Sequence, residues 1–269
     1  MEKLTVLGTG HASVTKCYNT CFTVSSGEEH FLVDAGGGNG ILVQLEKSNI
    51  DISNIHNMFV SHNHTDHLLG VIWMIRMIAQ RISRFHAKYD GNFNLYCSQD
   101  TANAINTIAK VTLPAPLYNN IGDRIKIIVV KNREKVRILE NEIEFIDVQS
   151  KKDLQYGFIA TLNNNRKLVF LGDEPYCNQY DDLIQDCDWL LTEAFCLYSE
   201  RDIFKPYEKF HSTAKDAAEI ANKFNVKNLL LWHTEDKNIE NRKELYTNEA
   251  KQCFNGNIFV PDDLEVIQL

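Results

Sequence analysis

The sequence predicts an α/β (α+β) protein in which two β-sheets pack face to face and helices lie outside them. Two observations support this prediction. Short apolar and β-branched runs alternate with helical patterns along the chain, and each half begins with strands and ends in helices. Such an order is expected when two sheets form one layered core. No linker or low-complexity segment interrupts the 269 residues, so we expect a single domain over residues 1–269.

The first half of the chain is expected to begin with a strand and a hairpin. Ser25 to Glu28 form the hairpin turn, and a Gly-rich turn at residues 36–38 follows the next strand. A long helix after residue 67 is apolar almost all round, as a buried helix should be. The expected strands are 4–7, 20–24, 30–33, 58–60 and 94–97, and the expected helices are 41–47, 68–82 and 101–110.

The second half is expected to repeat this order. Ser212 and Thr213 cap an alanine-rich helix, and Asn163 to Asn165 form a turn between two strands. The expected strands are 125–130, 136–139, 143–148, 156–162, 167–171, 188–192 and 229–232, with helices at 213–224 and 239–253 and short strands at the end.

Composition limits the classes of function. The formal net charge is −8 and no run of basic residues occurs, which argues against general affinity for nucleic acid. The seven cysteines have no regular spacing, so they do not predict a disulfide framework. The first residues enter a strand without a signal-peptide pattern, and the apolar run at 68–78 is too short to span a membrane. We therefore expect a cytoplasmic protein without membrane partners.

Four residues that commonly bind metals lie together in the turn between residues 58–60 and the long helix. They are His62, His64, Asp66 and His67. His62 and His64 alternate along extended chain and project the same way, whereas Asp66 and His67 enter the first helical turn. Imidazole nitrogens and carboxylate oxygens suit zinc and, less exclusively, manganese or iron. The alternative is an exposed polar loop that is rich in histidine, but the tight spacing favours a metal site, with two neighbouring ions.

This motif, His62-x-His64-x-Asp66-His67, resembles the signature of the metallo-β-lactamase fold superfamily of binuclear metal hydrolases. The resemblance covers nearly the whole chain, and it implies the four-layer αββα sandwich of that superfamily.

Three further residues match positions of the superfamily. Asp173 follows a strand at a glycine turn and matches the bridging aspartate, and His233 follows the apolar strand 229–232 and matches the last histidine. Asp34 matches a strand-end aspartate that supports the metal loop, so we expect it to hold a ligand in place. Each alone could be an ordinary residue at a strand end.

The order of later motifs is similar to the ribonuclease Z branch, including its phosphodiesterase relatives. Glu193 follows a buried strand, and His211-Ser212-Thr213-Ala214 precedes a helix. In that branch the matching histidine helps to protonate the leaving oxygen and the glutamate orients the histidine. His211 is a plausible general acid by its chemistry alone, although it could also be a helix-terminal residue with no role.

Two departures from the branch are visible. The hairpin between Gly157 and Gly172 leaves no room for the long arm with which transfer-RNA-processing members grip RNA, so tRNA is a doubtful substrate. A ligand histidine is also missing, because no histidine occurs between His86 and His211. Gln149 stands in its place, unless Ser150, Lys151 or Asp153 occupies that position. An amide oxygen is a weaker zinc donor than imidazole, so the first ion is expected to bind weakly.

These observations predict a metal-dependent hydrolase, and they favour a phosphodiesterase that acts on a small-molecule or nucleotide phosphodiester. Asp66 is also expected to orient the attacking hydroxide, and Glu193 and His211 complete the catalytic set. The alternatives are a hydrolase of a carboxylic ester, lactone or thioester, or a non-catalytic metal-binding or sensing protein. Dimers are common in the branch, so a homodimer is one expected state. The resemblance implies Zn2+ (or Mn2+ or Fe2+) at two sites: one ion on His62, His64 and Asp173, and one on Asp66, His67, Asp173 and His233.

Overall fold

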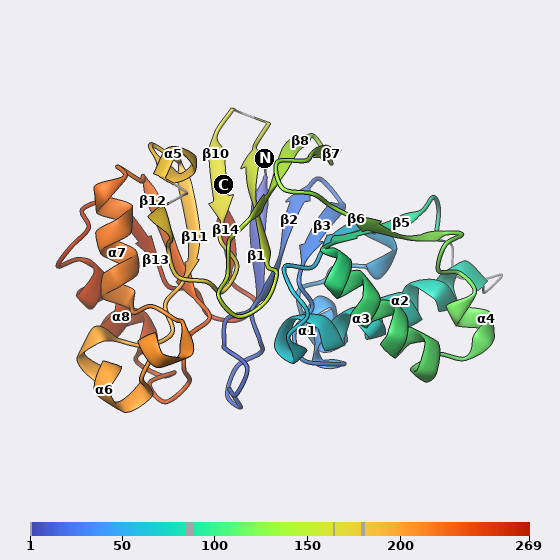
Figure 1. Cartoon of the computed structure of the whole chain (residues 1–269), viewed down its shortest axis with the longest axis horizontal. Coiled ribbons are helices and arrows are strands. Elements are labelled where there is room, and N and C mark those ends of the chain that lie inside the picture. The colour runs from blue at the N-terminus through green and yellow to red at the C-terminus, as the bar shows by residue number, and fades with distance from the viewer. Residues whose placement is uncertain (1, 84–88, 164, 179–180) are drawn as a thin grey trace. The chain divides into compact units, whose positions relative to one another are not determined.

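The structure is a computed structural model, and it describes residues 2–83, 89–163, 165–178 and 181–269 (Figure 1). The chain forms two compact units. The first contains residues 1–8, 18–131 and 263–269, and the second contains residues 9–17 and 132–262. Among the described residues, each unit has one seven-stranded mixed sheet with helices beside it. A single domain over residues 1–269 stays a prediction.

The sheet of the first unit has the order β14-β1-β2-β3-β4-β5-β6. Its strands are β1 (Lys3–Gly8), β2 (Cys21–Ser26), β3 (Glu29–Val33), β4 (Ile55–Phe59), β5 (Phe93–Cys97), β6 (Ile125–Val129) and β14 (Val266–Gln268). Strands β3 to β6 run parallel, whereas β1 pairs antiparallel with both β2 and β14. Leu4 stands opposite Ile267, so segments from far apart in the chain complete this sheet.

The first unit carries helices α1 (Gly40–Lys47), α2 (Thr65–Ser83), α3 (Gln99–Thr112) and α4 (Ala115–Tyr118), and a short 3-10 turn, η1 (Ile52–Asn54). Apolar residues of α1, α2 and α3 share one buried cluster with residues of the sheet. Helix α2 is buried over most of its length, which confirms the expectation from its all-round apolar sequence. Because α2 begins three residues after His62, its packing fixes the end of the metal-binding loop.

Gly70 lets the start of α2 approach the turn that follows β3. A Cβ atom at Gly70 would lie 1.8 Å from the carbonyl oxygen of Ala35, and the Gly70 amide donates to the oxygen of Gly36 at 2.9 Å. We expect Gly70→Ala to lower the free energy of unfolding by about 1–3 kcal/mol or more, the usual cost of overpacking. Urea unfolding checks this. Gly38→Ala is the matched control, because a Cβ there meets no atom within 4 Å; equal stability of the two variants would contradict the prediction.

The sheet of the second unit has the order β13-β12-β11-β10-β9-β8-β7. Its strands are β7 (Lys135–Ile138), β8 (Asn141–Asp147), β9 (Tyr156–Thr161), β10 (Lys167–Phe170), β11 (Trp189–Glu193), β12 (Asn228–Trp232) and β13 (Asn257–Phe259). Strands β10 to β13 run parallel, and β7 to β10 form antiparallel pairs. The predicted turn between β9 and β10 includes Asn164, which lies outside the described residues.

The helices of the second unit are α5 (Asp181–Ile184), α6 (Arg201–Phe204), α7 (Ala214–Lys223) and α8 (Arg242–Ala250), with 3-10 turns η3 (Tyr198–Glu200) and η4 (Tyr207–Lys209). Thr213 caps α7 in a capping box with Asp216, as the sequence predicted for this region. Helix α8 is shorter than the expected range 239–253. The Asn241 amide donates to the oxygen of Asn238 and closes a turn before the helix begins.

None of the seven cysteines, all of which lie in the described part of the chain, forms a disulfide. Across that same part, no helix is both long enough and apolar enough to cross a membrane.

Candidate metal centre

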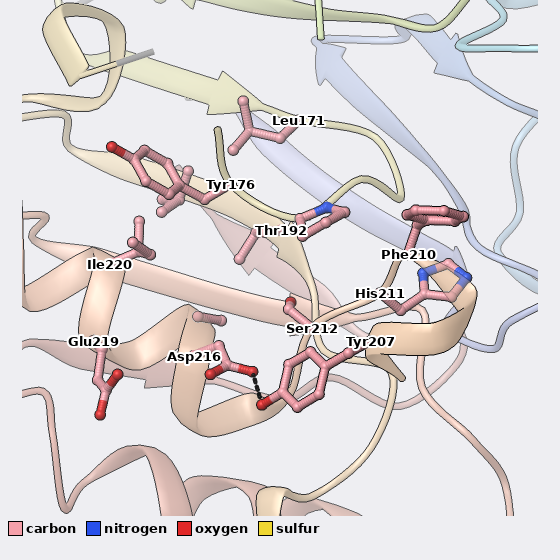
Figure 2. Close-up of a pocket in the computed structure, with 13 residues that line it drawn as sticks. Leu171, Tyr176, Thr192, Tyr207, Phe210, His211, Ser212, Asp216, Glu219 and Ile220 are labelled. Carbon is pink, nitrogen blue, oxygen red and sulfur yellow. Dashed lines mark hydrogen bonds between the residues drawn. The ribbon is translucent and has the colours of Figure 1, made fainter. Parts of the chain in front are cut away.

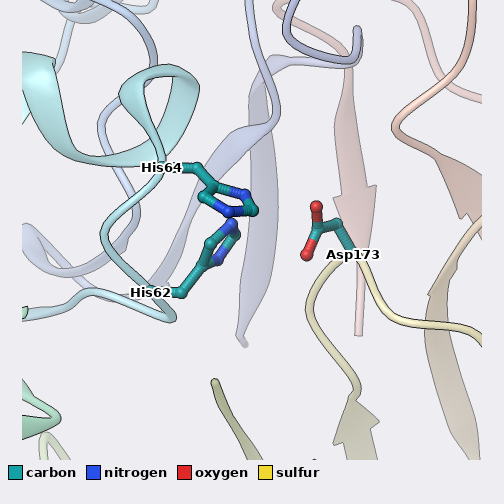
Figure 3. A group of neighbouring side chains, drawn as sticks. All are labelled: His62, His64 and Asp173. Atoms are coloured by element: carbon teal, nitrogen blue, oxygen red, sulfur yellow. The ribbon is translucent and has the colours of Figure 1, made fainter. Parts of the chain in front are cut away.

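The histidines of the first unit gather on the loop between β4 and α2. His62 and His67 are buried, and His64 is half-buried. The ring centroid of His62 lies 4.4 Å from that of His64 and 4.2 Å from that of His67. Figure 3 shows the first two rings side by side on this loop. One short segment therefore brings three imidazoles together, with Asp66 next to them on the first turn of α2.

Asp34 holds this loop in place through hydrogen bonds. Its carboxylate accepts hydrogen bonds from the backbone amide and the hydroxyl of Ser61, both at 2.8 Å, and from Nδ1 of His67 at 2.8 Å. Asp34 has a positive φ of 55°, an unusual conformation for a non-glycine residue. Since Nδ1 of His67 must carry the proton in this bond, Nε2 is the atom that can bind a metal. A supporting role for Asp34 in a metal site stays a prediction.

His67 is also close to Asp66, whose Oδ2 lies 3.3 Å from Nε2. Burial lowers the pKa of His67, but the Asp66 and Asp34 carboxylates outweigh burial and raise its pKa well above the ordinary value. Without an ion these carboxylates therefore favour the protonated ring. A metal ion must displace that proton, so metal binding through this loop should weaken as pH falls.

The second unit places its candidate ligands at the carboxyl ends of neighbouring parallel strands. Asp173 follows β10 by three residues (Figure 3), Glu193 ends β11, and His233 follows β12 directly with a positive φ of 54°. Since β10, β11 and β12 run parallel, their ends meet at one edge of the sheet, the usual ligand-binding edge of such sheets. His233 Nε2 lies 3.7 Å from Oδ2 of Asp173. One ligand atom from each of Asp173, His211 and His233 falls within 4.8 Å of the others.

His211 is held by Glu193. Nδ1 of His211 lies 3.3 Å from Oε2 of the fully buried Glu193. Glu193 is itself fixed, because its Oε1 accepts from the backbone amide of Ser212 at 2.5 Å. Phe195 stacks on the imidazole with 4.8 Å between centroids and an interplanar angle of 7°. Burial lowers the pKa of His211, but the Glu193 carboxylate raises it above the ordinary value. The pair therefore holds the imidazole in a fixed orientation and favours its protonated form.

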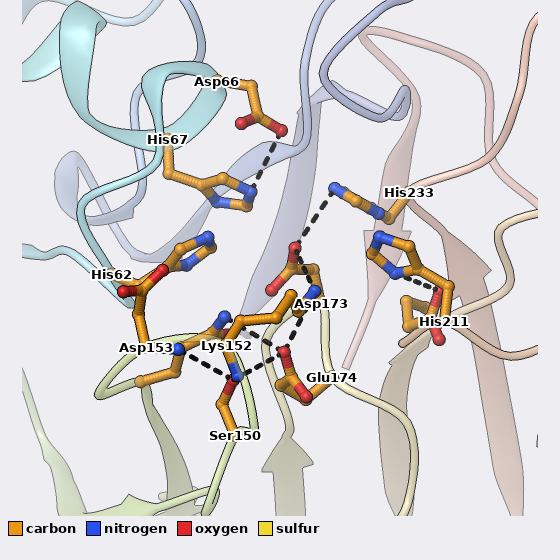
Figure 4. Close-up of polar contacts among 12 residues, drawn as sticks. His62, Asp66, His67, Ser150, Lys152, Asp153, Asp173, Glu174, His211 and His233 are labelled. Carbon is orange, nitrogen blue, oxygen red and sulfur yellow. Dashed lines mark hydrogen bonds and ion pairs between the residues drawn. The ribbon is translucent and has the colours of Figure 1, made fainter. Parts of the chain in front are cut away.

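Sequence reasoning missed two charged residues next to Asp173, the buried Glu174 and the half-buried Lys152. Lys152 Nζ lies 3.0 Å from Oε1 of Glu174 and 3.9 Å from Oδ2 of Asp173 (Figure 4). A lysine in a polar loop is usually solvated, and nothing in its sequence neighbourhood indicates burial. Glu174 gave a weak signal, because it directly follows the predicted bridging aspartate.

Gln149 follows β8 by two residues. It is exposed and has a positive φ of 49°, and its backbone amide donates to Oδ1 of Asp147 at 2.8 Å. This hydrogen bond between residues two positions apart is typical of a turn. Ser150, an alternative for the missing ligand, instead donates to Glu174 at 2.8 Å, and its hydroxyl oxygen accepts from the backbone amide of Asp153 at 3.4 Å. Gln149 as a substitute ligand stays a prediction.

A pocket of about 320 Å³ opens beside His211 in the second unit. Its wall is largely apolar and contains Tyr176, Tyr207 and Phe210. Figure 2 shows His211 and Phe210 at one end of this pocket, with Tyr176 at the other. The hydroxyl of Tyr207 donates to Oδ2 of Asp216 at 2.9 Å, which fixes the ring. The volume lies at the lower end of the range for ligand pockets, so the pocket suits a small molecule.

The ligand chemistry within each unit fits a divalent metal ion. The first unit offers three imidazoles and a carboxylate from one loop, and the second offers an imidazole and a carboxylate that follow β12 and β10. Nitrogen and oxygen donors of this kind suit zinc and related ions.

Comparisons with known proteins agree with this chemistry. A ribonuclease Z of Picrophilus torridus is 26% identical over 98% of this chain and 94% of its own length. The crystal structure of the metallo-β-lactamase fold protein YhfI from Bacillus subtilis superimposes with a TM-score of 0.78 at 18% identity, covering 100% of both chains. Zn2+-bound PqqB from Methylobacterium extorquens gives a TM-score of 0.74 at 12% identity, covering 99% of this chain and 100% of PqqB.

The predicted fold class is confirmed: two mixed sheets with flanking helices match the metallo-β-lactamase fold. The chain lies in that superfamily and in its ribonuclease Z-like branch, and the prediction of a metal-dependent hydrolase of the phosphodiesterase type is confirmed. The model of the family described as Anti-Pycsar protein Apyc1 matches residues 2–252. The chain therefore belongs to the Anti-Pycsar protein Apyc1 family.

Proposed function

We propose that this protein hydrolyses a small nucleotide phosphodiester and that this activity underlies the anti-Pycsar description of its family. The observation that carries the proposal is the His211–Glu193 pair at one end of a pocket walled by aromatic rings. A general acid beside such a pocket can protonate a leaving oxygen while the planar part of the same molecule sits between the rings.

The metal ligands are proposed from the sequence resemblance and from the donors present within each unit. The first ion would use His62, His64 and Asp173, and the second would use Asp66, His67, Asp173 and His233. The second set contains two imidazoles and two carboxylates, so it is the one expected to stay filled, and zinc is the proposed ion. When bound, such an ion supplies an acidified water and neutralises charge on the phosphate.

The residues of the chain then have distinct tasks. Asp34 fixes the tautomer of His67, and Asp66 is proposed to orient the attacking hydroxide. His211 holds a proton, and Glu193 and Phe195 fix the position of its ring. The proton passes from His211 to the leaving oxygen as the bond from phosphorus to that oxygen breaks. Glu193 stabilises the charged imidazole before this transfer, so it acts by positioning His211 and not by contact with phosphate.

A large RNA is the less favoured substrate. The hairpin of β9 and β10 is closed, with Thr161 opposite Lys167, and the net charge of −8 disfavours a polyanion. Because one relative is named ribonuclease Z, an RNA substrate is included among the substrates to be tested. The absence of disulfides among the cysteines fits a cytoplasmic location, and a homodimer is proposed by analogy with the branch.

Metal content and turnover together test this function. The purified protein, assayed for metal by elemental analysis, is expected to hydrolyse bis-p-nitrophenyl phosphate and a panel of cyclic and linear nucleotide phosphodiesters. A chelator should remove both metal and activity. Metal without turnover on any phosphodiester would overturn the proposal. Activity on esters, lactones or thioesters would then support a hydrolase of those substrates. Absence of activity on all of them would support a metal-binding or sensing role. Cleavage of a precursor tRNA in preference to small nucleotides would restore an RNA substrate.

Tyr207 gives a prediction about the pocket. Tyr207→Ala should raise KM for the nucleotide substrate by about 5–150-fold, because stacking of a base on an aromatic ring is worth about 1–3 kcal/mol. Tyr207→Phe keeps the ring and loses only the hydroxyl that donates to Asp216, so its KM should stay close to that of the parent. Steady-state kinetics on both variants decide this. If Tyr207→Ala kept the KM of the parent, the base of the nucleotide would not stack on Tyr207.

A further inference from the structure

Lys152 is a cation enclosed by acidic residues of the second unit. Its ammonium group lies 3.0 Å from Glu174 and 3.9 Å from Asp173. Its side chain is only 17% exposed, and the two carboxylates are 6% and 4% exposed. A pair at the surface would be worth little, but a partly buried one is screened much less by water and salt.

The surrounding hydrogen bonds fix Glu174 in the position where it meets Lys152. Its Oε1 also accepts from the hydroxyl of Ser150 at 2.8 Å and from the side-chain amide of Gln155 at 3.1 Å. The Ser150 hydroxyl in turn accepts from the backbone amide of Lys152 at 3.0 Å. Ser150 and Glu174 therefore hold both ends of the lysine, its backbone and its ammonium group (Figure 4).

Lys152 lies close in the sequence to the position expected for the missing histidine ligand. The resemblance to the branch predicts that Gln149 takes the position of a histidine that would help to bring an ion to Asp173. Lys152 follows only three residues later, and it carries a positive charge to the same aspartate. On that prediction, the loss of one metal ligand and the gain of one partly buried cation occur within residues 149–152.

We propose that the Lys152 ammonium takes over the charge of the first metal ion, so that the protein works with one tightly bound ion and one lysine. This inference rests on the proposed function. The carboxylate of Asp173 then faces one metal ion and one ammonium group, and Lys152 would stabilise negative charge on a phosphoryl oxygen without covalent chemistry. Glu174 is the residue that positions it.

The number of bound ions tests this directly. Elemental analysis of the wild-type protein after dialysis against excess zinc should give one tightly bound ion per chain. Lys152→Arg keeps the charge and should also bind one. Lys152→Ala combined with Gln149→His removes the cation and restores the ligand, and it should bind two. Thermal unfolding confirms that each variant is folded.

Turnover provides the second readout. Lys152→Ala should lose about 10²–10³-fold in kcat, the usual cost of removing one group that stabilises developing charge, while its single ion is retained. Two tightly bound ions in the wild-type protein would overturn the proposal, as would wild-type kcat in Lys152→Ala. The ion count stands even if the protein proves inactive on phosphodiesters, so failure of this inference and failure of the proposed function are distinguishable.

Discussion

Replacing Asp66 and His67 together with alanine is expected to remove most of the tightly bound metal. These residues come from one helical turn, and both are proposed ligands of the ion that stays filled. Loss of an outer partner of a ligand costs about 10–100-fold in metal affinity or activity, so loss of two ligands should reduce turnover by more than ~100-fold. Elemental analysis and phosphodiesterase assays measure the two effects.

A matched control lies on the preceding strand. His56 is on β4, where Nδ1 pairs with Glu29 at 2.9 Å and Nε2 lies 2.9 Å from the carbonyl oxygen of Asp90. His56→Ala removes an imidazole from the same unit and should leave metal content unchanged. If the double variant kept the metal stoichiometry of the parent, the loop would not be the metal site.

Removing the imidazole of His211 should reduce turnover about as strongly as the double replacement of Asp66 and His67, but it should have little effect on metal content. A general acid is typically worth ~10²–10⁴-fold, and His211→Ala should lose that factor on a substrate with a poor leaving group. On bis-p-nitrophenyl phosphate the loss should be much smaller, because p-nitrophenolate leaves without protonation. Equal losses on both substrates would count against the acid role.

Glu193 provides a pH test of the same assignment. A general acid must be protonated, so activity should fall as pH rises through the pKa of His211. The Glu193 carboxylate raises that pKa, and Glu193→Gln should therefore move the alkaline limb of the pH–rate profile to lower pH. A shift of this kind would not follow from a merely structural role for Glu193. If the alkaline limb did not move, Glu193 would not be the residue that raises the pKa of the general acid.

The sequence predicted the features that depend on neighbours in the chain. The metal loop, its entry into α2 and the capped start of α7 are local patterns of polar and apolar residues, and the structure has each of them. Asp34 and His67 meet across 33 positions, and a supporting role for Asp34 was expected only from the resemblance to a known family.

Other features depend on distant segments that no local pattern encodes. Lys152 is partly buried because the ends of β8 and β10 bring it to Glu174, whereas residues 149–153 around it in the sequence are all polar. Helix α8 begins later than expected, and the side chain of Asn238 before it is held by Glu200, 38 positions away. Both contacts join segments that are far apart in the sequence, which a local pattern does not encode.

The pairing of β1 with β14 has a consequence for how the protein is made. Leu4 leaves the ribosome well before its partner Ile267, which is synthesised roughly 10–50 seconds later at ordinary elongation rates. During that interval β2 can already cover one side of β1, whereas the other side shows unpaired amides and carbonyls to any extended chain nearby. Nascent copies crowded on one messenger RNA would meet through this open edge, so slow elongation or a truncated carboxyl end should raise the aggregated fraction before it alters the folded enzyme.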